Sequence, residues 1–170
     1  MFLNYIKEFF VKKSLKNHLH IVKNEVFTSN VQTIGLLIDE STFRHSKELV
    51  KELILQGIAS ENITIVVYRG KLKKEKTYSR PTFGVKHINW MGEFTEEFLN
   101  VFTETEFDLL ISYYQIEKPI LMMTTSKSKA KFKVGFSSVD KRLNRWMIDT
   151  EIENYKLFVT ELFKYLRSIK

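Results

Sequence analysis

Thr33-Ile-Gly-Leu-Leu-Ile38 and Ile63-Thr-Ile-Val-Val-Tyr68 are two short apolar runs, and together they decide the fold of this chain. Such runs are typical of parallel strands that are buried on both faces of a sheet. Between them, apolar residues recur at helical spacing at Leu49, Val50, Leu53 and Ile54. Gly57 follows, and glycine suits the left-handed conformation that often ends a helix. Residues 33–68 therefore predict a strand–helix–strand unit of an α/β fold.

The same alternation continues to the end of the chain. Further strands are predicted at 85–90, 107–113, 131–136 and 146–149, and helices at 93–103, from Pro119 and at 151–168. In the 131–136 strand Val134 and Phe136 alternate with lysines, so we expect this strand at an edge of the sheet. The predicted fold is a three-layer, mostly parallel, Rossmann-like sheet of about five or six strands with helices on both faces.

Length and composition indicate a single domain. The 170 residues are 44% hydrophobic and 28% charged, which is typical of a globular protein. We expect residues 1–28 to form a basic amphipathic helix with a connector, and residues 29–170 to form the α/β domain. The chain has no cysteine, which excludes thiolate chemistry and fits a reducing compartment. Because Lys7 and Glu8 interrupt any signal-peptide core, we expect a cytoplasmic protein, with peripheral contact to the inner membrane as an alternative.

The first residues predict an amphipathic helix over 2–20. Its apolar face includes Phe2, Ile6, Phe9 and Phe10, and lysines flank that face. An aromatic face flanked by lysines suits the surface of an anionic membrane. The alternative is that the same face packs on the sheet or on a second subunit, so a homo-oligomer stays open.

Positive charge is concentrated in three stretches of a chain whose net charge is +7, namely the first thirty residues, 69–86 and 127–145. The second and third of these follow or adjoin predicted strands. In open α/β sheets, ligands bind beyond the carboxyl ends of the strands. Guanidinium groups match phosphate geometry, so the expected anion-binding residues are Arg69, Arg80, Arg142 and Arg145. The expected partner is a phosphorylated ligand, RNA or an anionic lipid, and the alternative is a solvated basic surface.

No catalytic, metal or cofactor site is predicted. The first strand leads into Asp39-Glu-Ser-Thr42 instead of a glycine-rich phosphate loop, which disfavours dinucleotide or P-loop binding. Asp39, Ser41 and His45 lie close in sequence, but no Gly-x-Ser-x-Gly elbow accompanies them. We therefore interpret Asp39 and Ser41 as caps of the following helix. Tyr113 is expected in the core and Tyr114 at the surface.

Two resemblances extend this interpretation. Ser128-Lys-Ala-Lys-Phe-Lys-Val-Gly-Phe-Ser137 and Val139-Asp-Lys-Arg-Leu-Asn144 resemble an uncharacterised family of short proteins from Bacteroidetes. That resemblance implies a lineage and no activity. Phe107-Asp-Leu-Leu-Ile111 and Lys131-Phe-Lys-Val-Gly135 resemble the N-terminal half of heptosyltransferase-like glycosyltransferases, which implies a Rossmann-like half-domain.

The sequence thus favours a binding domain over an enzyme, with an anionic partner at the carboxyl edge of the sheet. Three alternatives remain at this point. They are a single-domain or degenerate glycosyltransferase-like enzyme, a membrane-surface adaptor that uses the N-terminal helix, and an RNA-binding protein that spreads arginines and aromatics over one positive face.

Overall fold

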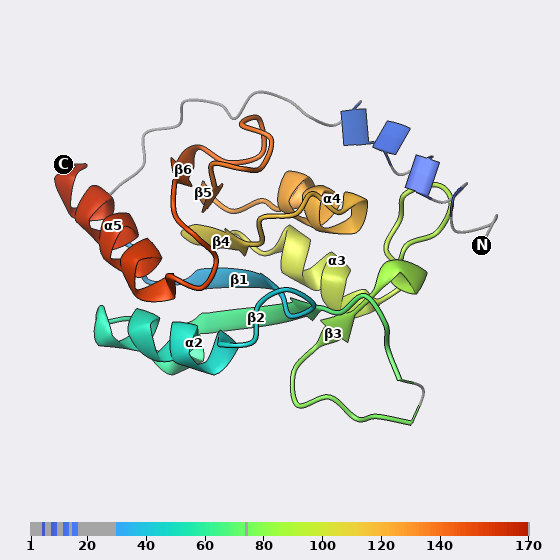
Figure 1. Ribbon diagram of the computed structural model, residues 1–170, viewed down its shortest axis with the longest axis horizontal. Coiled ribbons are helices and arrows are strands. Elements are labelled where there is room, and N and C mark those ends of the chain that lie inside the picture. Colours follow the sequence, from blue (N-terminus) through green and yellow to red (C-terminus); the bar gives the residue numbers. More distant parts are fainter. Residues whose placement is uncertain are drawn as a thin grey trace.

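The computed structural model describes residues 30–73 and 75–169 together with positions 5, 8, 9, 12, 13, 15 and 16. Its elements, in chain order, are β1 (Ile34–Asp39), α2 (Ser46–Leu55), η1 (Ser60–Asn62), β2 (Ile63–Tyr68), β3 (Thr82–Phe83), η2 (Val85–His87), α3 (Glu97–Glu104), β4 (Leu109–Tyr113), α4 (Pro119–Lys127), β5 (Phe132–Phe136), β6 (Trp146–Ile148) and α5 (Tyr155–Ser168). Figure 1 shows these elements wrapped around one sheet.

The six strands form a single parallel sheet in the order β3-β2-β1-β4-β5-β6. This order is the one found in doubly wound Rossmann-like sheets. Strand order reverses between β1 and β4, so the connections that leave these two strands run in opposite directions. The predicted α/β class is confirmed, and so is the prediction that β1, β2 and β4 are neighbouring core strands.

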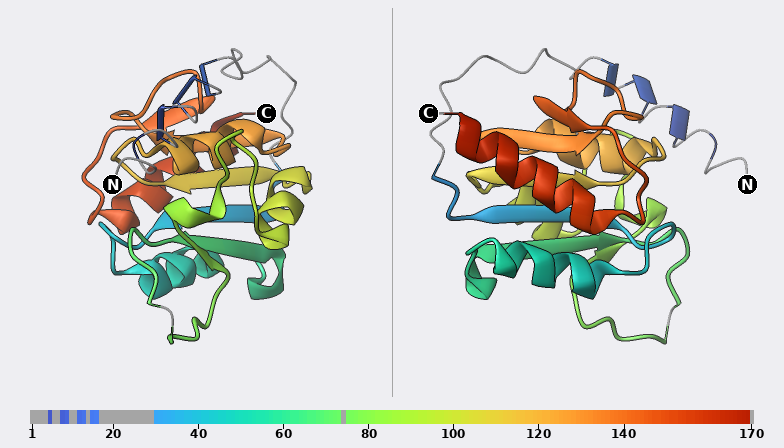
Figure 2. Two further views of the ribbon diagram at one scale, coloured as in Figure 1. Left: turned by 90° about the vertical axis from the view of Figure 1, so that its right-hand side faces the viewer. Right: turned by 60° about the vertical axis from the view of Figure 1, so that its left-hand side comes forward.

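Helices cover both faces of the sheet and make three layers. Side chains of β1 alternate between them: Ile34, Leu36 and Ile38 pack with α2 and α5, while Leu37 packs with α3 and α4. The right-hand view of Figure 2 shows α2 and α5 together in front of the sheet. Every residue of β1 and β4 is buried, which explains why their sequences are continuous apolar runs instead of alternating ones.

The 131–136 strand is not at an edge, so that prediction was wrong. β5 pairs with β4 on one side and with β6 on the other. Its alternating lysine has a different cause. The side chain of Lys133 lies against the end of α4, where its ammonium donates to the carbonyl oxygens of Thr125 (2.8 Å) and Ser126 (3.3 Å). A lysine that satisfies the last carbonyls of a helix gives the same sequence pattern as a solvent-facing one.

Residues 85–90 do not form the predicted strand. The third strand is Thr82–Phe83, and it is followed by η2 and by one isolated bridge between Ile88 and Phe94. Because β3 pairs only with Val67 and Tyr68, the amino half of β2 remains partly exposed at Thr64 and Ile65. Pro81, which lacks an N–H, lies at the start of this short edge strand and uses only its carbonyl in pairing.

The predicted helix over residues 2–20 lies mostly outside the described residues, and this includes Phe2, Ile6 and Phe10. Of its apolar face, Phe9 is described and is 57% exposed. Leu15 is buried and belongs to the apolar cluster on the α3 and α4 side of the sheet. At Gly57, φ is +96°, which confirms the left-handed residue predicted after the first helix of the domain. None of the helices in the described ranges is long and apolar enough to cross a bilayer.

Candidate functional site

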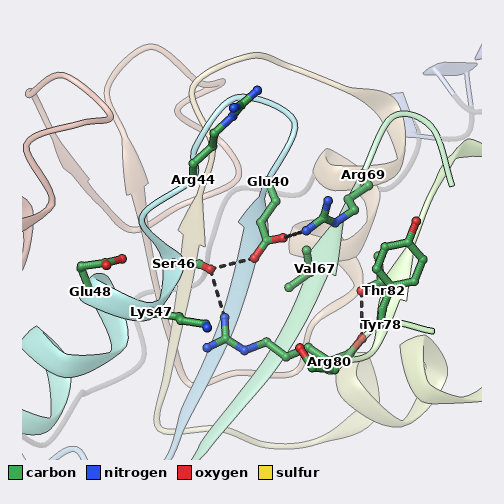
Figure 3. Close-up of a pocket in the computed structure, with 11 residues that line it drawn as sticks. Glu40, Arg44, Ser46, Lys47, Glu48, Val67, Arg69, Tyr78, Arg80 and Thr82 are labelled. Atoms are coloured by element: carbon green, nitrogen blue, oxygen red, sulfur yellow. Dashed lines mark hydrogen bonds and ion pairs between the residues drawn. The ribbon is translucent and has the colours of Figure 1, made fainter. Parts of the chain in front are cut away.

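A cavity of about 580 Å³ opens at the carboxyl edge of the sheet, beyond β1, β2 and β3. Asp39 and Tyr68 are paired at the ends of β1 and β2, so the segments that follow both strands meet at this edge. The start of α2 and the segment before β3 complete the wall. The lining residues are Glu40, Arg44, Ser46, Lys47, Glu48, Val67, Arg69, Tyr78, Ser79, Arg80 and Thr82, and Figure 3 shows their arrangement.

A chain of hydrogen bonds crosses the cavity and joins four segments of the fold. Arg69 donates from Nη2 to Glu40 Oε2 at 2.5 Å. Ser46 Oγ donates to the other oxygen of Glu40 at 2.7 Å, and Arg80 Nη1 donates to Ser46 Oγ at 3.1 Å. The Glu40 side chain is 14% exposed, so this carboxylate is a largely buried counter-ion held inside the cavity. The network fixes the segment before β3 against the start of α2.

The cavity carries more positive than negative charge. Four cations line it, Arg44, Lys47, Arg69 and Arg80, against two carboxylates, Glu40 and Glu48. Of these cations only Arg69 forms an ion pair with a described residue. Lys47 and Arg80 point toward one another across the start of α2 (Figure 3). No side chain caps this helix, so its first N–H groups add partial positive charge at the same wall.

A second polar cluster lies where strand order reverses, between the ends of β1 and β4. Asp39 is fully buried; its Oδ2 accepts from Lys118 Nζ at 2.5 Å and its Oδ1 accepts from both the amide and the hydroxyl of Ser41. The ammonium also lies 4.8 Å from the ring centroid of Tyr68. The sequence had suggested that Asp39 and Ser41 cap α2, and this was wrong, because no side chain caps that helix. The Asp39 carboxylate is turned inward instead, where it compensates Lys118.

His45 does not join Asp39 and Ser41 in a catalytic arrangement. Its ring stacks with Tyr155 at a centroid distance of 6.1 Å, and its Nε2 lies 3.6 Å from Glu153. Both partners lie at the start of α5 or just before it. His45 thus links the beginning of α2 to the beginning of α5. Asp39, Ser41 and His45 are close in sequence, but they do not form a catalytic triad in space.

The four arginines predicted from the sequence separate into different places. Arg69 and Arg80 meet at the cavity. Arg142 lies in the turn after β5, on the other half of the sheet, where Asp140 accepts from it at 2.6 Å. Arg145 precedes β6 and therefore lies at the amino edge, with its guanidinium carbon 5.9 Å from the ring centroid of Phe132. Because β6 is parallel to the other strands, a residue before it faces the edge opposite the cavity.

The lysines around β5 are engaged locally instead of forming one basic surface. Lys127 donates to the carbonyl of Gly92, Lys129 pairs with Glu104, and Lys131 pairs with Asp108. Lys131 and backbone donors from Gln32 and Thr33 lower the pKa of the Asp108 carboxyl to about 2, against the opposing effect of burial. These contacts hold α4 and the segment before β5 against α3, the residues before α3 and the start of β4.

Lys133 provides a pH-dependent test of this local arrangement. Burial lowers the pKa of its ammonium to about 8, below the ordinary lysine value of 10.5. Between these two values the folded chain binds fewer protons than the unfolded chain, so stability rises with pH. We expect the wild type to gain about 2 kcal/mol relative to Lys133→Met between pH 7 and pH 10. Urea unfolding at both pH values measures this difference, and parallel pH profiles of the two proteins would contradict it.

Sequence reasoning missed several residues of both clusters. From the sequence, Glu40 was only part of a segment that lacks a phosphate loop, but in the structure Arg69 compensates its charge at the cavity. Lys118 directly precedes Pro119, the first residue of α4. A predicted helix start after a strand was the one signal in the sequence that Lys118 lies near the strand ends.

The prediction for Tyr114 was wrong. It was expected at the surface, yet it is fully buried and its hydroxyl shares a 2.9 Å hydrogen bond with Thr125.

Comparison with known proteins gives a family and no activity. The model of DUF6913, a family of unknown function, matches residues 7–169. No curated protein and no solved structure shows significant similarity to the chain. The match agrees with the resemblance to an uncharacterised family, and it supports neither the Bacteroidetes lineage nor the glycosyltransferase similarity. Within the described residues, no group of three or more histidine, aspartate or glutamate side chains could hold a metal ion.

Proposed function

The chain belongs to the DUF6913 family of unknown function, and from its own site we propose that it binds a small phosphate-bearing ligand in the cavity beyond β1, β2 and β3. The observation that carries the proposal is the uncompensated charge of the lining. Arg44, Lys47 and Arg80 have no carboxylate partner among the described residues, although all three border one cavity. A cysteine-free chain fits a reducing compartment, so we propose that this binding takes place in the cytoplasm.

Three physical features support an anionic ligand. The volume falls within the range of about 300–1,000 Å³ that small-molecule sites occupy. Guanidinium groups give charge-assisted, directional hydrogen bonds to phosphate oxygens. The start of α2 adds N–H groups, which suit an anion as well. Glu40 opposes binding by charge, yet it also positions Arg69 and Ser46 before a ligand arrives. We therefore propose that the site binds its ligand through the cations and the start of α2, and we assign no reaction to it.

Arg80→Ala is expected to weaken binding of a phosphorylated ligand about tenfold or more, because a hydrogen bond to a charged group is removed. Glu40→Gln is expected to strengthen it, because a competing negative charge disappears while the amide oxygen can still accept from Arg69. Titration calorimetry with ribose 5-phosphate at low and moderate salt measures both effects. Affinity should fall as salt rises, because the contacts are ionic.

Arg142→Ala is the matched control, since this arginine is also predicted from the sequence but lies on the other half of the sheet. Binding should be unchanged in that variant. Loss of binding in Arg142→Ala together with retention in Arg80→Ala would move the site to the β5 end. Absence of ribose 5-phosphate binding to the wild type at low salt would overturn the proposal.

A further inference from the structure

The charge of the cavity matches one phosphate monoester. Its four cations and two carboxylates leave an excess of two positive charges. A phosphate monoester carries about −1.5 to −2 at neutral pH, because its second pKa is near 6. A phosphodiester inside a nucleic-acid strand carries only one negative charge. The lining therefore favours a terminal phosphate over the backbone of a polymer.

The cavity also has an aromatic wall. Tyr78 borders it on the side away from α2, as Figure 3 shows. Its ring has three neighbours: the hydroxyl accepts from the amide of Lys73 at 3.1 Å, and the guanidinium carbon of Arg69 and the ammonium of Lys76 lie 5.3 and 5.7 Å from the ring centroid. A half-buried tyrosine ring that is fixed by its neighbours is a ready surface for stacking a planar group.

One of the two walls belongs to the element that holds the phosphate in nucleotide-binding doubly wound sheets. In this topology the phosphate lies at the start of the helix after the first strand. Here α2 follows β1 and opens into the cavity, while the segment that carries the aromatic wall follows β2. The contacts from the Tyr78 ring through Arg69 and Glu40 to Ser46 span the distance between the two walls.

We infer, building on the proposed function, that the ligand is a free nucleoside monophosphate. Its phosphate lies between Lys47 and Arg80 at the start of α2, and its base stacks on Tyr78. The segment after β1, from Glu40 to His45, contains no glycine, so it lacks the close backbone approach that a pyrophosphate needs. A single phosphate requires no such approach. The site thus differs from a dinucleotide site although the topology is shared.

Calorimetric titration of the full chain with adenosine 5′-monophosphate, ribose 5-phosphate and a 5′-phosphorylated oligoribonucleotide tests this inference. We expect the nucleotide to bind about 5- to 150-fold more tightly than ribose 5-phosphate, which is the range for stacking one base on an aromatic side chain. Tyr78→Ala should reduce nucleotide affinity to that of ribose 5-phosphate and leave the sugar phosphate unchanged. Tyr78→Phe, which keeps the ring, should retain the preference.

The outcomes separate this inference from the proposed function. Equal affinity of the wild type for the nucleotide and for ribose 5-phosphate would overturn the base-stacking inference while the phosphate site stands. Failure of both compounds to bind would overturn the phosphate site as well. An oligoribonucleotide that binds more tightly than the mononucleotide would overturn the free nucleotide in favour of an RNA end.

Discussion

Replacing Lys118 with methionine is expected to lower the free energy of unfolding by about 3–5 kcal/mol, because it breaks a buried ion pair and leaves the other charge uncompensated. Asp39 is fully buried at the end of β1, and Lys118 is the cation that compensates it, at 2.5 Å. Without the ammonium, the Asp39 carboxylate is left buried with no compensating cation. This costs folding free energy, and urea unfolding at pH 7 measures the loss.

Two controls isolate the buried charge as the cause. Lys164→Met removes the cation from the pair with Glu161, whose two side chains are 74% and 47% exposed, and we expect a change below about 1 kcal/mol. Adding Asp39→Asn to Lys118→Met removes the stranded carboxylate, and this double variant should recover most of the lost stability. Equal losses in Lys118→Met and Lys164→Met would show that Asp39 needs no compensation.

Phe158→Ala is the substitution with the second large expected effect, a loss of about 3–5 kcal/mol from truncating a fully buried aromatic ring. Phe158 lies on α5, and its ring contacts Tyr113 and Phe136 at centroid distances of 5.0 and 4.8 Å. These partners come from β4 and β5, so the ring fastens α5 to the centre of the sheet. Thermal and urea unfolding should both report the loss.

The neighbouring residue supplies a matched control for Phe158. Leu157 is on the same helix but is 48% exposed, so Leu157→Ala leaves no enclosed cavity. We expect it to change stability by less than about 1 kcal/mol. If Leu157→Ala were as destabilising as Phe158→Ala, helix propensity or an unseen partner, and not burial against the sheet, would be the cause.

Much of the fold could be predicted because burial imposes a periodic pattern on the residues themselves. The apolar runs of β1 and β4 and the stripe of α5 that contains Phe158 and Leu162 are local signals of this kind. Strand neighbours are not local. Lys133 suggested an edge strand, because the sequence shows only that a lysine is present. It does not show whether the ammonium binds helix carbonyls, as here, or faces water.

The candidate site was predictable only as a region. The rule that ligands bind beyond the carboxyl ends of parallel strands selected the segment after β2, and Arg69 and Arg80 do lie together there. The rule could not show that Arg145 lies at the opposite edge of the sheet, because this depends on where the next strand begins. Arg145 directly precedes β6, so it lies at the amino end of that strand.

The sequence by itself determined the fold class, the apolar residues of the central strands and the net positive charge, since each depends on composition or on spacing within one element. Only the tertiary structure decided which charges meet. Asp39 and Lys118 are far apart in the chain, as are Glu40 and Arg69, yet each pair lies at 2.5 Å. Ion pairs and cavities arise where separate segments come together, and their strength depends on exclusion from water, which no stretch of sequence displays.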